Sequence, residues 1–100
     1  MSKPQKAGKI SPGLERVVEE CKEARTLDTT MLSGIIRFSQ GVDYQALLTG
    51  FKEHYPGFRV VVPGRDVTIV GFRSPAKYIN DLAGHKEVVE IKLPIEYIRS

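Results

Sequence analysis

The residue types that most often carry catalysis or bind metals are few in this sequence and lie far apart. The two histidines, His54 and His85, belong to different predicted segments, and Cys21 is the only cysteine. Metal sites need several such ligands at short and regular spacings. The sequence also has no glycine-rich phosphate-binding loop and no nucleophile turn around a serine. We therefore predict no catalytic residues, no metal and no cofactor, and we expect the protein not to be an enzyme.

The acidic residues and the cysteine have simpler explanations than chemistry. Asp28, Asp43 and Asp66 stand at predicted helix starts or turns, where a carboxylate accepts hydrogen bonds from backbone amides. Cys21 continues the apolar spacing of its predicted helix and is expected in the core. A single cysteine cannot form an internal disulfide, and no apolar run approaches the ~20 residues that span a bilayer. We therefore expect a cytoplasmic protein without a membrane segment.

The positive charge is concentrated at the N-terminus. Lys3, Lys6 and Lys9 account for the formal net charge of +3, because the other basic residues equal the 12 acidic ones in number. Residues 1–10 contain almost no apolar side chains. We predict a disordered basic tail over residues 1–10 and a single domain over residues 11–100.

A second basic group lies inside the domain. Between residues 59 and 77 one acidic residue, Asp66, accompanies four basic ones, and a patch of this kind attracts phosphates. The candidate RNA-binding residues are Arg59, Arg65, Arg73 and Lys77.

The elements that must position these residues follow from caps, periodicity and turns. A serine or aspartate before each apolar repeat predicts helices, two of them with proline at the first position. Two β-branched runs flank a Pro-Gly-Arg-Asp turn, which predicts a hairpin, and an alternating run follows near the C-terminus. The expected elements are helices 12–25, 43–55 and 75–83, hairpin 58–72 and strand 87–93.

The segment 29–40 satisfies two patterns at once. As a strand it places Leu32, Gly34, Ile36 and Phe38 on one face; as a helix it groups residues 31, 32, 35 and 36 between a capping aspartate and a terminating glycine. The strand gives βαββαβ after an N-terminal helix, a ferredoxin-like arrangement. The helix gives a winged-helix-like α+β fold. Periodicity alone does not decide between the two folds.

A family resemblance favours the helix. The runs "MLSGIIRFSQGVDYQALLTGFKEHY", "GFRSPAKYINDL" and "EVVEI", from residue 31 to residue 91, resemble the LOTUS (OST-HTH) domain. The shared features are an apolar helix, a Gly-Val step, an amphipathic helix, a Gly-Phe pair before another helix, and a Val-Val strand. On this basis we predict the winged-helix-like fold, with the ferredoxin-like arrangement as the alternative.

The resemblance also implies partners. LOTUS domains are interaction modules of germline and RNA-granule proteins, and one class contacts the C-terminal RecA-like lobe of Vasa-type DEAD-box RNA helicases. It implies a helicase partner, RNA as a second partner, and a germ-granule location in the cytoplasm. The implied partner surface is the exposed side of helix 43–55, formed by Gln45, Thr49, Lys52 and Glu53. The ferredoxin-like alternative implies a homodimer or a domain that senses a small ligand.

Overall fold

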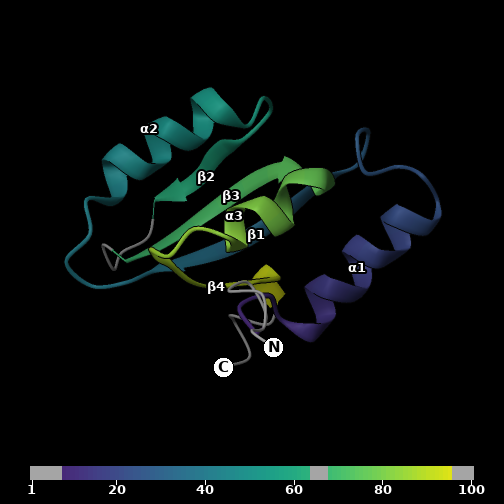
Figure 1. The fold of residues 1–100 in the computed structure, drawn as a ribbon, viewed down its shortest axis with the longest axis horizontal. Coiled ribbons are helices and arrows are strands. Elements are labelled where there is room, and N and C mark those ends of the chain that lie inside the picture. The colour runs from purple at the N-terminus through teal and green to yellow at the C-terminus, as the bar shows by residue number, and fades with distance from the viewer. Residues whose placement is uncertain (1–7, 64–67, 96–100) are drawn as a thin grey trace, which may run out of the picture.

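A computed structural model describes residues 8–63 and 68–95 and shows helices packed on a four-stranded sheet (Figure 1). The strands are all antiparallel, in the spatial order β2-β3-β1-β4. The predicted α+β fold is confirmed. Along the chain, the elements are α1 (Pro12–Glu23), β1 (Met31–Phe38), α2 (Tyr44–His54), β2 (Arg59–Pro63), β3 (Ile69–Pro75), the 3-10 helix η1 (Ala76–Tyr78), α3 (Ile79–Ala83) and β4 (Val88–Lys92).

The predicted helix over residues 29–40 is wrong, because this segment forms the central strand β1. It pairs with β3 on one side and with β4 on the other. The two residues that suggested helix ends have other roles. Asp28 forms an ion pair with the Lys77 Nζ at 3.0 Å, and Gly41 has a φ of 85° in the loop before α2. The winged-helix-like arrangement is therefore not the one observed, and the element order after α1 is that of the ferredoxin-like alternative, βαββαβ.

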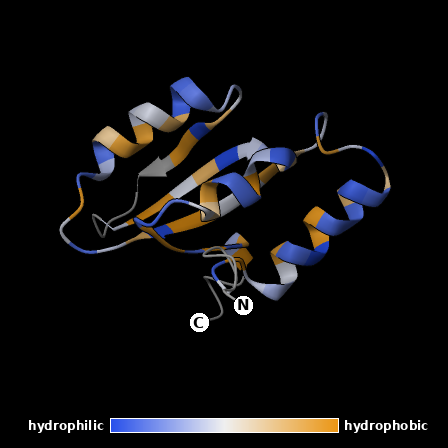
Figure 2. Ribbon diagram, viewed as in Figure 1, coloured by the Kyte–Doolittle hydropathy of each residue, from blue (hydrophilic) through white to orange (hydrophobic). Residues whose placement is uncertain are grey.

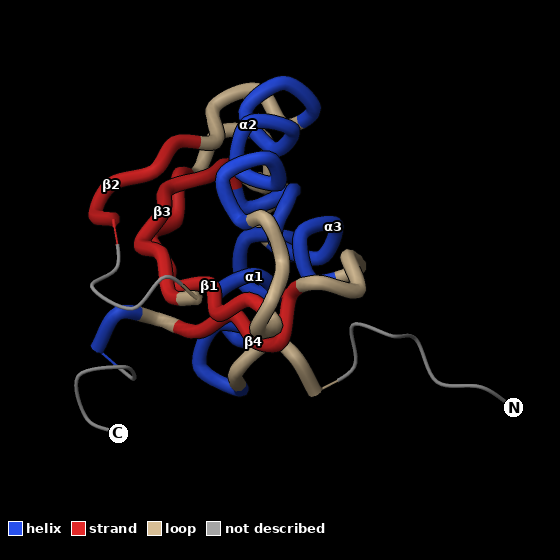
Figure 3. The backbone as a smooth tube through the Cα atoms, turned by 90° about the vertical axis from the view of Figure 1, so that its left-hand side faces the viewer, coloured by secondary structure: helices blue, strands red, loops and turns tan. Residues whose placement is uncertain are grey.

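The core lies between the sheet and the helices. In Figure 3 the helices α2 and α3 lie on one side of the sheet, and α1 packs beside β4 and η1. Figure 2 shows hydrophobic residues interspersed with hydrophilic ones along α1 and α2, as amphipathic helices require. Leu14 of α1, Ile36 of β1 and Leu82 of α3 are all fully buried in this core.

Both long helices begin where the sequence predicts. The hydroxyl of Ser11 accepts a hydrogen bond from the Leu14 amide at 3.3 Å. The carboxylate of Asp43 accepts one from the Ala46 amide at 3.2 Å. Each cap satisfies a backbone donor that the first helical turn leaves without a partner. Cys21 is buried, as the helical spacing predicted.

The predicted start of the third helix needs a correction. Ser74 does not cap a helix: it is buried in β3 opposite Leu32, and its hydroxyl donates to the Pro75 carbonyl at 3.1 Å. Sheet pairing continues through Pro75, so the helical segment begins only at Ala76, as a 3-10 turn without a side-chain cap. Ser74 and Pro75, which resemble a helix start in the sequence, therefore belong to strand β3.

The boundary of the predicted tail also moves. Residues 1–7 lie outside the described part of the chain. Ile10, which the sequence analysis assigned to the tail, is 6% exposed and forms a parallel bridge with Ile91 of β4. The Ile91 amide donates to the Lys9 carbonyl at 2.7 Å, and the Ser11 amide donates to the Ile91 carbonyl at 3.0 Å. The segment before α1 thus pairs with the edge strand β4.

Candidate functional site

The sheet has one face toward the helices and one face that no described element covers (Figure 3). Side chains alternate between the two faces along each strand. In β1, for example, Gly34, Ile36 and Phe38 are buried while Ser33 and Arg37 are exposed. We call the second surface the open face. The strand registers place on it Met31, Ser33, Ile35 and Arg37 of β1, Ile69 and Arg73 of β3, Arg59 of β2, and Glu90 and Lys92 of β4.

Two arginines of the open face lie directly opposite each other. The register pairs Arg59 of β2 with Arg73 of β3, and Arg73 in turn with Ser33 of β1. Side chains opposite each other on one face of a sheet have Cβ atoms about 4.5–5.5 Å apart. The two arginines and Met31 line a cavity of about 240 Å³. Within residues 8–63 and 68–95, no carboxylate forms an ion pair with either guanidinium.

The other charged residues of the open face are linked by ion pairs. The Arg37 Nε lies 3.1 Å from the Glu90 carboxylate, and the Lys92 Nζ lies 3.7 Å from the same carboxylate. The half-buried Ile35 lies between Arg37 and the row of the arginine pair, whereas the half-buried Ile69 lies opposite Arg37. The open face therefore has a group of two cations and one carboxylate on one side and two arginines on the other, with apolar side chains distributed along it.

The predicted RNA-binding residues do not form one patch. Arg59 and Arg73 come together, whereas Arg65 lies outside the described residues. Lys77 belongs to η1, where its Nζ contacts Asp28 and lies 5.1 Å from the centre of the Tyr78 ring. The hydrogen bond to Asp28 and the charge of that carboxylate raise the pKa of Lys77. Lys77 thus already has an anionic partner inside the chain.

The predicted partner surface on α2 is accessible. Gln45, Thr49, Lys52 and Glu53 are all exposed. The Thr49 hydroxyl donates to the Gln45 carbonyl at 3.0 Å, an interaction within the helix itself. These four residues lie on the exposed side of α2, and the predicted contact through them stays a prediction.

A group of three side chains, Phe51, Tyr55 and His85, joins the C-terminal end of α2 to the loop before β4. The Tyr55 hydroxyl and the His85 Nε2 share a hydrogen bond at 2.8 Å, and the Phe51 ring centre lies 4.9 Å from that of His85. Burial raises the pKa of Tyr55, and the nearby charge of Asp81 adds to this effect. The contact holds the C-terminal end of α2 against the loop after α3. Residues 30 positions apart carry no local signal that would have predicted it.

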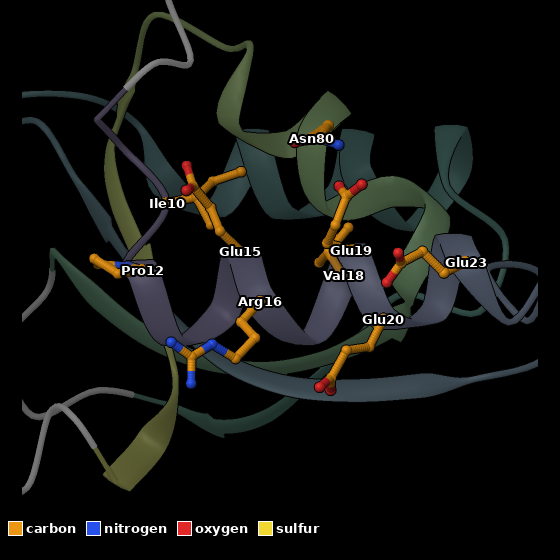
Figure 4. Close-up of a pocket in the computed structure, with 9 residues that line it drawn as sticks. All are labelled: Ile10, Pro12, Glu15, Arg16, Val18, Glu19, Glu20, Glu23 and Asn80. Carbon is orange, nitrogen blue, oxygen red and sulfur yellow. The ribbon is translucent and has the colours of Figure 1, made fainter.

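A second cavity, of about 650 Å³, runs along α1 and reaches Asn80 of α3 (Figure 4). Its lining includes four acidic residues of α1, Glu15, Glu19, Glu20 and Glu23. In the described part of the chain, no three histidine, cysteine or acidic side chains are grouped so that they could hold a metal ion. We therefore assign no ligand to this groove.

Two further findings bear on the kind of protein. None of the helices in the described residues is long and apolar enough to cross a membrane. A comparison of the chain with protein-family models, with curated proteins and with solved structures finds no match.

Proposed function

We propose that this chain is a non-enzymatic interaction domain that binds a partner protein through the open face of its sheet. The observation that carries the proposal is the division of the sheet. The helices cover one face, while the other presents Met31 and Ile35 near two arginines that have no ion-pair partner in the described residues. Methionine and arginine are enriched at protein interfaces relative to the rest of the protein surface.

The composition of the open face favours a protein over RNA. Proteins that bind single-stranded RNA on a sheet stack its bases on aromatic rings. The positions of the described strands that face outward hold no aromatic side chain, because Phe38 and Phe72 point into the core.

The helicase partner stays a prediction of the LOTUS resemblance. The germ-granule and cytoplasmic location is also a prediction of that resemblance. The homodimer is a prediction of the ferredoxin-like alternative. The winged-helix arrangement from which the helicase contact was inferred is replaced here by a sheet. A helicase core is therefore one defined candidate to test on the open face, and the exposed side of α2 is the surface to compare with it.

Site-specific photocrosslinking tests the proposal. The photoreactive residue p-benzoylphenylalanine replaces either Ile69 on the open face or Glu53 on α2. Each variant is irradiated in an extract of the cells from which the protein comes, and separately with a DEAD-box helicase core. We expect adducts from position 69 that protease removes and ribonuclease does not, and few from position 53. Adducts from position 53 alone, or adducts removed by ribonuclease, would contradict the proposed interface.

A further inference from the structure

The open face contains a more specific feature than an apolar surface. We propose that Arg59 and Arg73 form a binding site for a carboxylate, and that its ligand is an aspartate or glutamate side chain of the partner protein. This inference rests on the proposed function and names the chemistry by which the open face selects its partner.

The first step of the argument is the placement of two like charges. Opposite positions on one face of a sheet normally hold complementary pairs, because like charges there repel each other. Arg59 and Arg73 occupy such a position, and no acidic residue of the described chain pairs with either. An anion supplied from outside would remove the repulsion, so the two arginines together favour an anionic ligand.

The second step is the donor geometry. A guanidinium presents several N–H donors in a planar fork that matches the two oxygens of a carboxylate. A carboxylate between the arginines would therefore accept hydrogen bonds from two side chains on neighbouring strands.

The third step is the size and lining of the cavity. Its volume of about 240 Å³ lies below the roughly 300–1,000 Å³ of pockets that hold free small ligands. It therefore suits one side chain of a larger partner better than a complete ligand. The third residue of its lining, Met31, is 37% exposed and offers apolar contact to the carbon atoms of an acidic side chain.

The fourth step separates a carboxylate from a nucleic-acid phosphate. Binding a nucleic-acid backbone depends on several cations along its path. Of the other cations on the open face, Arg37 and Lys92 are ion-paired with Glu90. In the described sheet, only the row of Arg59 and Arg73 has cations that no carboxylate contacts. A single carboxylate needs no more than that row.

The experiment is a nuclear magnetic resonance titration of the full chain, observing the arginine Nε–Hε signals. The probes are the blocked peptide Ac-Gly-Glu-Ile-Glu-Gly-NH₂, the same peptide with glutamine at both acidic positions, inorganic phosphate, and a uridine oligonucleotide. The variants are Arg59→Gln, Arg73→Gln and, as a control with the same change of charge, Arg16→Gln on the exposed surface of α1.

We expect the glutamate peptide to shift the signals of Arg59 and Arg73 together, and the glutamine peptide to leave them in place. Each of the variants Arg59→Gln and Arg73→Gln should weaken binding at least tenfold, whereas Arg16→Gln should leave it unchanged. An equal loss in the Arg16 variant would show attraction by net charge alone and would overturn the proposal. Tighter binding of the uridine oligonucleotide or of phosphate would overturn it as well.

The two proposals fail separately. Protein adducts from position 69, combined with no response of the arginine signals to the glutamate peptide, would reject the carboxylate site and leave the open face as the interface. If position 69 gives no protein adduct, the proposed function itself is rejected, whatever the peptide does.

Discussion

Replacing Gly34 by alanine tests the register of the sheet most directly. Gly34 lies in β1 opposite Phe72 of β3, and both face the core. A Cβ atom at residue 34 would lie 2.7 Å from the Cε1 atom of Phe72 and 2.8 Å from its Cζ atom. The ring cannot move aside freely, because it is 1% exposed and stacked on Phe58 with ring centres 5.5 Å apart.

The magnitude follows from two opposing effects. Overpacking a core costs about 1–3 kcal/mol, whereas alanine in place of glycine recovers roughly 0.5–1 kcal/mol of backbone entropy. We expect Gly34→Ala to lower the free energy of unfolding by about 1 kcal/mol, which corresponds to about 4–8 °C in the melting temperature of a domain of this size. Thermal and urea unfolding, followed by circular dichroism, measure the change.

A control and a double-mutant cycle make the test specific. The glycine at position 50, in α2, has open space where a Cβ atom would lie, with no neighbouring atom within 4 Å, so Gly50→Ala should stabilise the protein by up to about 1 kcal/mol. Phe72→Leu removes the atoms that crowd residue 34. It should therefore destabilise the Gly34→Ala protein less than the wild type, with a coupling energy of about 0.5–3 kcal/mol. If Gly34→Ala is as stable as the wild type, or if the two changes are additive, the strand register described here is wrong.

Three further predictions concern charge, pH and the N-terminal segment. When no partner protein is bound, Arg59→Gln should raise the free energy of unfolding by about 0.2–1 kcal/mol, because it removes repulsion from Arg73. Added salt should reduce this increase, as measured by thermal unfolding. The pKa of Tyr55 is raised in the folded state, so its contribution to stability is complete below the ordinary tyrosine value of about 10 and is lost as the pH rises through the folded value. The Tyr55→Phe variant lacks the hydrogen bond to His85 and should be less stable than the wild type by about 1 kcal/mol at neutral pH. Between neutral and alkaline pH, its free energy of unfolding should fall by less than that of the wild type. Equal decreases in the two proteins would contradict this. Ile10→Ala should lower the free energy of unfolding, measured with urea, by about 2 kcal/mol or more, because Ile10 is part of the core. An unchanged urea midpoint would show that Ile10 is not part of the core.

The features that the sequence predicted correctly are local ones. Ser11 and Asp43 cap helices because each accepts a hydrogen bond from an amide three residues later, an interaction that needs no other part of the chain. Cys21 is buried because helical spacing places it on the apolar side of α1. The hairpin of β2 and β3 follows from two β-branched runs separated by a short turn.

The features that the sequence did not decide depend on residues far apart. The apolar residues between positions 31 and 38 fit a helix or a strand, and pairing with β3 and β4, some 40 and 55 positions later, selects the strand. Ser74 resembles a helix cap in isolation, but pairing of β3 with β1 keeps it in the sheet. In both cases hydrogen bonds between strands override a local preference.

By itself, the sequence determined the mixed composition of helices and strands, two helix starts, and the absence of a recognisable catalytic motif. Only the tertiary structure decided which basic residues lie side by side. Arg59 and Arg73 are neighbours because antiparallel pairing, with its shift between Val60 and Val62, aligns them across two strands. Lys77 instead forms an ion pair with Asp28. The physical reason is that side chains alternate between faces of a sheet, so a register slip of one residue would place either arginine on the opposite face.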